Sequence, residues 1–240
     1  MRTKLLVIVS CLTSSYAVAA PLCQMPKTWD DFHSTQKSKI EITSRDRSDR
    51  VVSILLYEAL SLSPDFLPCL QPHCSSVNGE NKEGLHVTPA SSLPAPADRR
   101  EFVATWAEQI TKGLDKPLAS KKILPFLHPS MTNTSWENLF AGRLLLEKPT
   151  PASIGPAIAA FEAAIRSDYN FVPAYLGLAE ALAIRYALEG DEAVARRAHV
   201  ELAKAQLLNP VLSKIKEDRI QWYLTKDRKN LKEICGDSKK

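Results

Sequence analysis

Glycine is scarce in this chain of 240 residues, which has 8 glycines against 16 prolines. Loops that cradle phosphates and tight β-hairpins both depend on glycine, because it adopts positive φ without strain. The Gly-x-Gly-x-x-Gly, Walker, Gly-x-Ser-x-Gly and His-Glu-x-x-His patterns are all missing. These absences argue against nucleotide-dependent and hydrolytic enzymes, and the composition favours helices separated by prolines. We therefore expect neither an enzyme nor a cofactor.

Long apolar runs are missing after the first twenty residues, which have the layout of a secretory signal peptide. Arg2 and Lys4 begin it, Leu5–Leu12 is largely apolar, and Ala17-Val18-Ala19 offers a small-x-small cleavage pattern. Serines and threonines interrupt the apolar stretch, whereas a spanning helix needs about 20 mostly apolar residues. We predict that residues 1–19 are a signal peptide, with an uncleaved anchor as the alternative. The rest of the chain is then soluble, not membrane-spanning, and periplasmic or secreted.

An excess of charge of one sign is missing too. Taking Arg2 and Lys4 from the 31 basic residues leaves 29 against 27 acidic residues, so the exported chain carries a net charge of +2. Such a balanced composition gives no reason to expect nucleic acid or an anionic membrane as the partner.

Cysteine is limited to five residues, one of which lies in the predicted signal peptide. An even number of cysteines in an exported chain indicates disulfides, and four cysteines allow three pairings. We expect a small-loop bridge between Cys69 and Cys74, which would leave Cys23 to pair with Cys235. The alternative is a zinc site using Cys69, His73 and Cys74. Structural zinc needs four ligands and no second pair of this kind is present, so no metal is predicted.

The N-terminal region, residues 20–97, is predicted to contain one helix and to be otherwise irregular. Val51–Leu62 has apolar residues at helical spacing, whereas Ile40-Glu41-Ile42 and Leu85-His86-Val87 suit short strands. Proline, serine and asparagine dominate residues 67–97, which end in a linker-like segment. A mixed α/β region is therefore left open.

Residues 98–240 are predicted to form a helical domain. Apolar stripes predict helices close to 98–114, 134–148, 157–166, 173–188, 191–208 and 212–224. Thr134 with Glu137 indicates a capping box for the second of these helices. Gly190 and Asp191 indicate a helix end followed by an N-cap. Short connections between successive helices imply antiparallel neighbours, which means helical hairpins in series.

Two of these helices share one template at an offset of 41 residues. Each has a small residue, a large apolar residue four positions on, a small residue three further and a stop five after that. The members are Ala157, Phe161, Ala164 and Tyr169 in one helix and Ala198, Leu202, Ala205 and Pro210 in the other. Small residues let a neighbouring helix come close, and the large residue fills the gap between hairpins. A degenerate copy of this frame is carried by Val52, Leu56, Ala59, Pro64 and Phe66.

This pattern resembles the tetratricopeptide repeat, which has a large-x-x-Leu-small start and an Ala-x-x-x-Phe second helix that ends at Pro. Pro173-Ala174-Tyr175 with Leu178-Ala179 is similar to the start of that unit. The usual period is about 34 residues, and the extra length here is about two helical turns, so the apolar face keeps its direction. The resemblance implies a mainly α fold of antiparallel helical hairpins.

Residues 134–212 are similar to the repeat region of bacterial winged-helix transcriptional activators, some of which have a periplasmic sensory half. The similarity is carried by residues 138–146, 157–164 and 171–179. This chain does not contain the DNA-binding half of those proteins, and Tyr169 replaces their usual proline. The resemblance therefore implies a partner-binding or sensory repeat domain without DNA binding.

Three functions follow as hypotheses. The first is an interaction module whose stacked hairpins form a concave groove for a protein or peptide. Its candidate partner contacts lie on the first helix of each hairpin and are Asn138, Arg143, Tyr175, Glu180 and Arg185. The second is a periplasmic sensor or accessory subunit of a membrane-bound regulator. The third is a cell-envelope enzyme, which has no motif in its favour.

Overall fold

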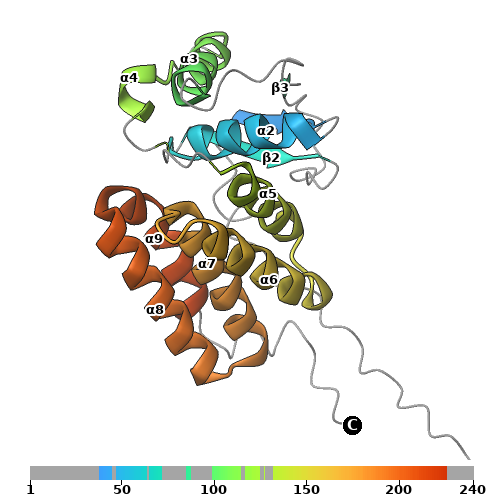
Figure 1. The fold of residues 1–240 in the computed structure, drawn as a ribbon, viewed down its shortest axis with the longest axis vertical. Helices are drawn as coiled ribbons and strands as arrows, with labels where there is room; N and C mark the ends of the chain where they lie inside the picture. Colours follow the sequence, from blue (N-terminus) through green and yellow to red (C-terminus); the bar gives the residue numbers. More distant parts are fainter. Residues whose placement is uncertain are drawn as a thin grey trace, which may run out of the picture.

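The structure, a computed structural model, combines a small parallel sheet with a series of packed helices (Figure 1). It describes residues 38–44, 47–63, 65–71, 85–87, 99–114, 117–124, 127 and 132–225. The predicted signal peptide lies outside the described residues, as does the linker-like segment. None of the described helices has the length and apolar character needed to span a bilayer.

Three short parallel strands form the sheet in the order β2-β1-β3. They are β1 (Ser38–Ile42), β2 (Phe66–Leu70) and β3 (Leu85–Val87). The central strand β1 buries Ile40 and Ile42 completely, because it is paired along both edges. The predicted strands at β1 and β3 are confirmed. Strand β2 was not expected, since the prolines around it had indicated a loop.

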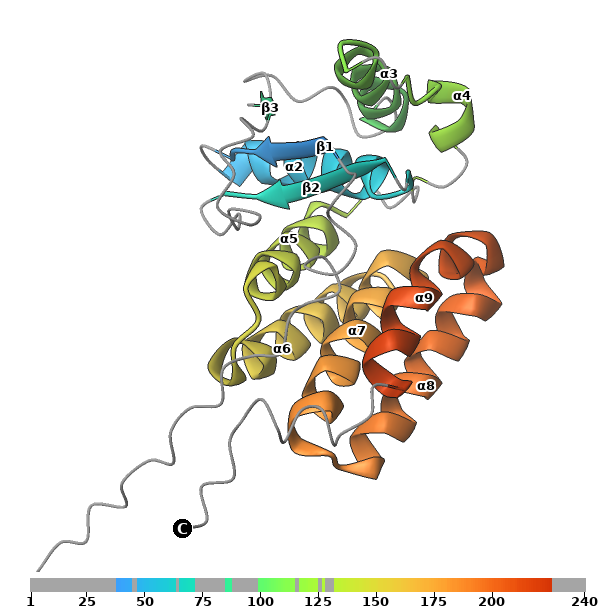
Figure 2. The ribbon, with the colours of Figure 1, turned by 180° about the vertical axis from the view of Figure 1, so that it is seen from behind.

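Helix α2 (Arg47–Leu60) connects β1 to β2 and packs against the sheet, as Figure 2 shows from behind. Parallel neighbouring strands need such a crossover because a tight turn cannot join them. Every residue from Val51 to Leu60 is buried, since α2 also contacts α3 and α5. The helix was predicted, but the degenerate repeat frame that it carries belongs to a βαβ unit and not to a helical hairpin.

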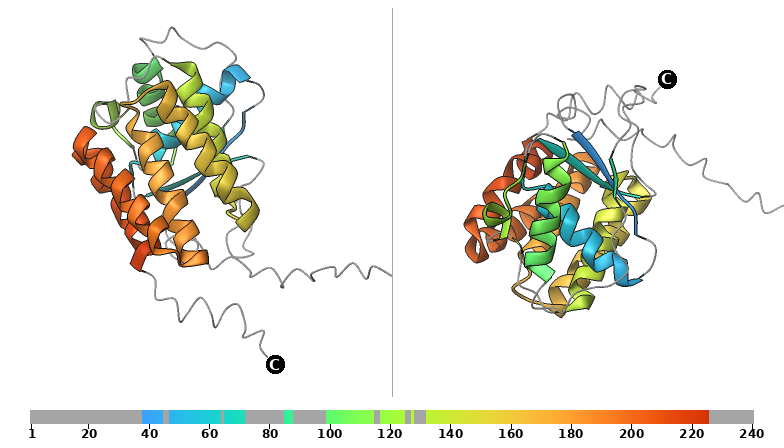
Figure 3. Two further views of the ribbon diagram at one scale, coloured as in Figure 1. Left: turned by 60° about the horizontal axis from the view of Figure 1, so that its bottom comes forward. Right: turned by 90° about the horizontal axis from the view of Figure 1, so that it is seen from above.

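Two further helices, α3 (Arg99–Lys112) and α4 (Ser120–Ile123), lie beside α2 (Figure 3). Helix α3 packs against α2 and α4, with Val103, Ala104 and Ala107 buried. The sequence analysis grouped this helix with the C-terminal helical domain. In the structure it belongs with the α/β part.

The C-terminal part is a helical array of α5 (Asn133–Glu147), α6 (Pro151–Ser167), α7 (Val172–Glu189), α8 (Glu192–Leu208) and α9 (Pro210–Thr225). Each helix packs against the next, and α7 also packs against α5 and α9 (Figure 1). The predicted mainly helical fold is confirmed together with a mixed α/β N-terminal part. Whether the hairpins are of the tetratricopeptide type remains a prediction.

Most predicted helix boundaries in the array are close to those observed. Gly190 has a φ of 72° and ends α7, and the Asp191 side chain accepts a hydrogen bond from the Ala193 N–H at 2.8 Å. The predicted capping role of Thr134 is wrong, because α5 already begins at Asn133. Thr134 therefore lies within the first turn.

The two template helices are α6 and α8, and their large residues occupy equivalent buried positions. Phe161 of α6 and Leu202 of α8 are 0% and 3% exposed. All four template alanines are completely buried, and they are Ala157, Ala164, Ala198 and Ala205. This burial confirms that the small–large–small spacing marks the packing face of each helix.

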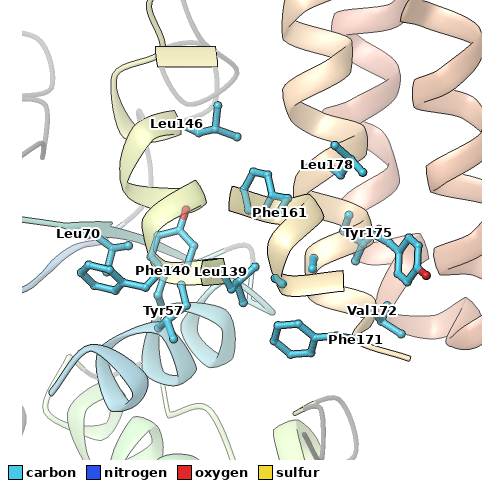
Figure 4. Packing of buried hydrophobic residues seen from close by; sticks show 14 of the residues in the cluster. Tyr57, Leu70, Leu139, Phe140, Leu146, Phe161, Phe171, Val172, Tyr175 and Leu178 are labelled. Carbon is cyan, nitrogen blue, oxygen red and sulfur yellow. The ribbon is translucent and has the colours of Figure 1, made fainter. Parts of the chain in front are cut away.

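The Phe161 ring lies in a slot lined by Gly142 of α5 and Gly177 of α7 (Figure 4). A Cβ atom on Gly142 would come within 2.5 Å of the ring, and one on Gly177 would also overlap it. Phe140, on another side of α5, faces Leu70 of β2 in the same figure. Helix α5 thus belongs to the packing of both parts, and one continuous core runs through the structure.

Candidate functional site

Five charged side chains gather where α2 meets the helical array, and we call them the charge cluster. They are Glu58 of α2, Arg143 of α5, Glu180 of α7, and Lys216 and Arg219 of α9. The first three are each less than a tenth exposed. Charged side chains are almost never this buried unless they are paired. The cluster is therefore the chemical feature of the described residues that most needs an explanation.

Arg143 is the centre of the charge cluster. Its Nε donates to Glu58 Oε1 at 3.0 Å and its Nη1 donates to Glu180 Oε2 at 2.7 Å. The rigid fork of a guanidinium suits this role, since it offers several donors in one plane. The Arg143 guanidinium carbon also lies 5.8 Å from the centroid of the Phe161 ring. The arginine of α5 therefore joins α2, α6 and α7.

Helix α9 contributes the other two cations. Lys216 and Arg219 are three residues apart and so lie on one face of the helix. Arg219 Nε is 2.5 Å from Glu180 Oε1, whereas Lys216 Nζ is 3.7 Å from Glu58 Oε2. Their side chains are 24% and 14% exposed. Solvent thus reaches the cluster from the side of α9.

Both carboxyl groups of the charge cluster stay ionised. Burial alone would raise the pKa of each, but the neighbouring cations outweigh it. Lys216 and Arg143 lower the pKa of Glu58, and Arg219 and Arg143 lower that of Glu180, so both fall below the ordinary value of 4.5. Burial works against the charge of Arg143 as well, yet the two carboxylates raise its pKa above the usual range. The pairing therefore holds three buried charges at neutral pH.

We expect the free energy of unfolding to fall as the pH drops from about 5 to about 3. A carboxyl group whose pKa is lower in the folded state stabilises the fold above its unfolded pKa, and this contribution disappears as the pH falls through the folded pKa. Glu58 and Glu180 are both in this position. Urea unfolding at a series of pH values measures the slope, which should be shallower in Glu180→Gln because one coupled carboxyl is gone. Equal slopes in the two proteins would rule out this origin.

Two of the five predicted partner contacts, Arg143 and Glu180, are brought together by the structure, but in its interior. They are 5% and 4% exposed and bond to each other. Glu58 and Arg219 complete their pairing. Neither residue is a surface group, so neither is carried into the binding surface proposed below.

The other three predicted contacts are separate from the charge cluster. The hydroxyl of Tyr175 donates to the Tyr169 carbonyl at 3.1 Å, and the ring is buried. Arg185 is exposed and pairs with Glu189 one helical turn away at 2.9 Å. Asn138 is half-buried on α5. The structure therefore does not unite the five predicted residues in one groove.

The sequence analysis missed Glu58, Lys216 and Arg219. A signal was present for the first, because Glu58 interrupts a helix that is otherwise almost wholly apolar. Glu180 stands out in the same way within α7. An acid in an apolar stretch predicts a buried cation beside it. It does not say which cation, since Arg143 is 85 residues from Glu58.

The predicted disulfides and the metal alternative fall largely outside the described residues. Cys69 is disulfide-bonded, while Cys23, Cys74 and Cys235 are not described. Its pairing with Cys74 stays a prediction. In the described ranges, no group of three or more His, Cys, Asp or Glu is placed to hold a metal ion.

Comparison with known proteins adds no relative. No family model matches the chain, and no curated protein or solved structure matches it. The tetratricopeptide resemblance therefore depends on the residues and spacings given above.

Proposed function

We propose that this chain is an exported helical-repeat module that binds a protein or peptide partner. Within residues 132–225, each helix packs against the next, and alternate helices α5, α7 and α9 pack in sequence. Arrays of this kind bury a shared seam and leave extended surfaces for partners. Both buried carboxyl groups have lowered pKa values, whereas a general acid needs a raised one. This difference favours binding over catalysis.

Exposed apolar side chains gather at one end of the array, and we call them the turn-end surface. They are Tyr169, Leu207, Leu208, Val211 and Ile215. The α6–α7 and α8–α9 turns lie at the same end because successive helices run antiparallel. Tyr175 connects the two turns, since its hydroxyl bonds to Tyr169 and Lys204 of α8 lies 5.9 Å from its ring centroid.

The exposure of the turn-end surface is the observation that carries the proposal. Leu207 is 87% exposed and Tyr169 is 70% exposed. Single apolar residues are common on protein surfaces, but grouped ones mark interaction sites. This surface differs from the concave groove expected from the sequence, where α2 and the charge cluster fill part of the space over α5.

Site-specific photocrosslinking tests the proposed surface. A benzophenone amino acid in place of Leu207, in the full chain expressed in its own cell, should give a discrete adduct. The same probe at Glu192, next to the turn at the opposite end of the array, should give little or none. Equal capture at the two positions would contradict the proposal. An adduct with a membrane-bound regulator would assign the accessory-subunit form of the function.

The affinity of the captured partner gives a second test. We expect Leu207→Ser with Val211→Ser to weaken binding by at least about tenfold, because losing anchors at the centre of an interface costs 1 kcal/mol or more for each. Both side chains are exposed, so the melting temperature should be nearly unchanged. The matched control is Val200→Ser, which removes an exposed apolar residue of α8 two turns away. Equal affinity in the double variant and the control would refute the surface.

A further inference from the structure

We propose that the charge cluster binds a small oxyanion at its solvent edge, between Lys216 and Arg219 of α9. The ligand class is a phosphate or carboxylate group, which accepts hydrogen bonds and carries negative charge. The site is separate from the turn-end surface and does not depend on it. It would give the junction between α2 and the helical array a ligand of its own.

The first argument is charge. The cluster contains three cations, Arg143, Lys216 and Arg219, against two carboxylates. Within the described part of the chain, these five groups dominate each other's electrostatics. One positive charge is thus in excess. Excess charge in a poorly solvated place is costly unless an opposite charge compensates it.

The second argument is hydrogen bonding. Arg143 uses Nε and Nη1, but its buried Nη2 has no hydrogen-bond partner among the described residues. Lys216 Nζ is 3.7 Å from the nearest carboxylate oxygen, which exceeds an ordinary hydrogen bond. Two cations therefore have donor capacity left over. A group that only accepts hydrogen bonds is the chemical complement of such donors.

The third argument is access. The solvent edge is formed by cations, because Lys216 and Arg219 are 14% and 24% exposed while Glu58 and Glu180 lie behind them at 7% and 5%. An approaching anion therefore meets positive charge first. Burial, reinforced by Arg143 and Arg219, holds the pKa of Lys216 below its ordinary value despite the opposing effect of Glu58. An anion beside Lys216 would stabilise its charged form.

Thermal unfolding of the full exported chain tests binding. Inorganic phosphate and acetate are each compared with chloride at equal ionic strength. At about ten times the dissociation constant, we expect the effective anion to raise the melting temperature by about 3–6 °C. The anion with the larger shift identifies a phosphate or a carboxylate ligand. An equal shift with chloride, or no shift with either anion, overturns the proposal.

Variants with opposite expected effects separate binding from a merely structural role. Lys216→Gln and Arg219→Gln should each abolish the anion-dependent shift. Glu58→Gln removes a competing negative charge and should strengthen binding several-fold, as measured by equilibrium dialysis with labelled phosphate or acetate. The control is Lys214→Gln on the same helix, because Lys214 is 75% exposed and pairs only with Glu217. A full shift in both glutamine variants of α9, or weaker binding in Glu58→Gln, overturns the assignment.

Discussion

Replacing Arg143 with methionine is expected to lower the free energy of unfolding by about 3–5 kcal/mol. The variant leaves Glu58 and Glu180 buried without the cation that bonds to both. Methionine is flexible and apolar, so it fills much of the space left by the guanidinium stem. The loss therefore comes mainly from the uncompensated carboxylates and not from a cavity.

Urea unfolding at neutral pH measures this loss. The matched control is Arg185→Met, because Arg185 pairs with Glu189 on the surface of α7 at 2.9 Å. An exposed pair of this kind contributes about 0.2–1 kcal/mol. Similar losses in the two variants would show that the charge cluster contributes no more than a surface pair.

A triple variant shows what kind of stabilisation the pairing provides. Glu58→Leu, Arg143→Met and Glu180→Leu together should be more stable than Arg143→Met alone, because no carboxylate is left buried without a partner. Lys216 and Arg219 can turn towards solvent along their apolar stems. A triple variant less stable than the single one would mean that the local packing, and not the charge balance, sets the cost.

Adding a single methyl group at Gly177 is expected to destabilise the protein by about 1–3 kcal/mol, although alanine is the better helix former. The new Cβ atom would overlap the ring of Phe161, which is completely buried between α5 and α7. The ring has no space to move away, so neighbouring helices must shift. Gly142→Ala should act in the same direction, since its Cβ would meet the other side of the slot at 2.5 Å.

The chain offers a matched control at Gly155 of α6. A Cβ atom there meets nothing within 4 Å. Gly155→Ala should therefore stabilise the protein by about 0.5–1 kcal/mol, in line with helix propensity. Thermal or urea unfolding of both variants measures the contrast. Stabilisation by Gly177→Ala to the same extent would exclude the slot.

A double-mutant cycle assigns the Gly177 effect to the ring. Phe161→Leu alone should be destabilising, but in the Gly177→Ala background it should recover part of the loss. The expected coupling is about 1 kcal/mol or more, as found for residues in direct contact. Additive effects would place the strain elsewhere. The same ring lies 5.8 Å from the Arg143 guanidinium carbon, so the slot and the charge cluster are neighbours.

The helical array could be predicted closely because its information is local. Apolar spacing of 3.6 residues, Gly190 with positive φ and the Asp191 cap all act within a few residues of each other. The equivalence of Phe161 and Leu202 was also visible, since the small–large–small spacing recurs in both helices. Strand β2 was missed because Pro68 and Cys69 disguise a short buried strand that is specified by its pairing with β1.

The candidate site could be predicted only in part. Arg143 and Glu180 were singled out on the correct helices, yet they were placed on a groove surface. A residue on the first helix of a hairpin can face a groove or a covering element, and periodicity does not distinguish the two. The presence of α2 beside α5 decides the outcome.

The sequence by itself determined where the helices of the array begin and end and which of their faces pack, because these properties depend on side chains three or four positions apart. The tertiary structure alone decided that Glu58 meets Arg143 and that the Phe161 ring enters a slot between two glycines. Those contacts join segments far apart in the chain, and they depend on how α2 and the array dock. Burial then turned ordinary charged residues into a coupled cluster, since charges attract strongly only where water is largely excluded.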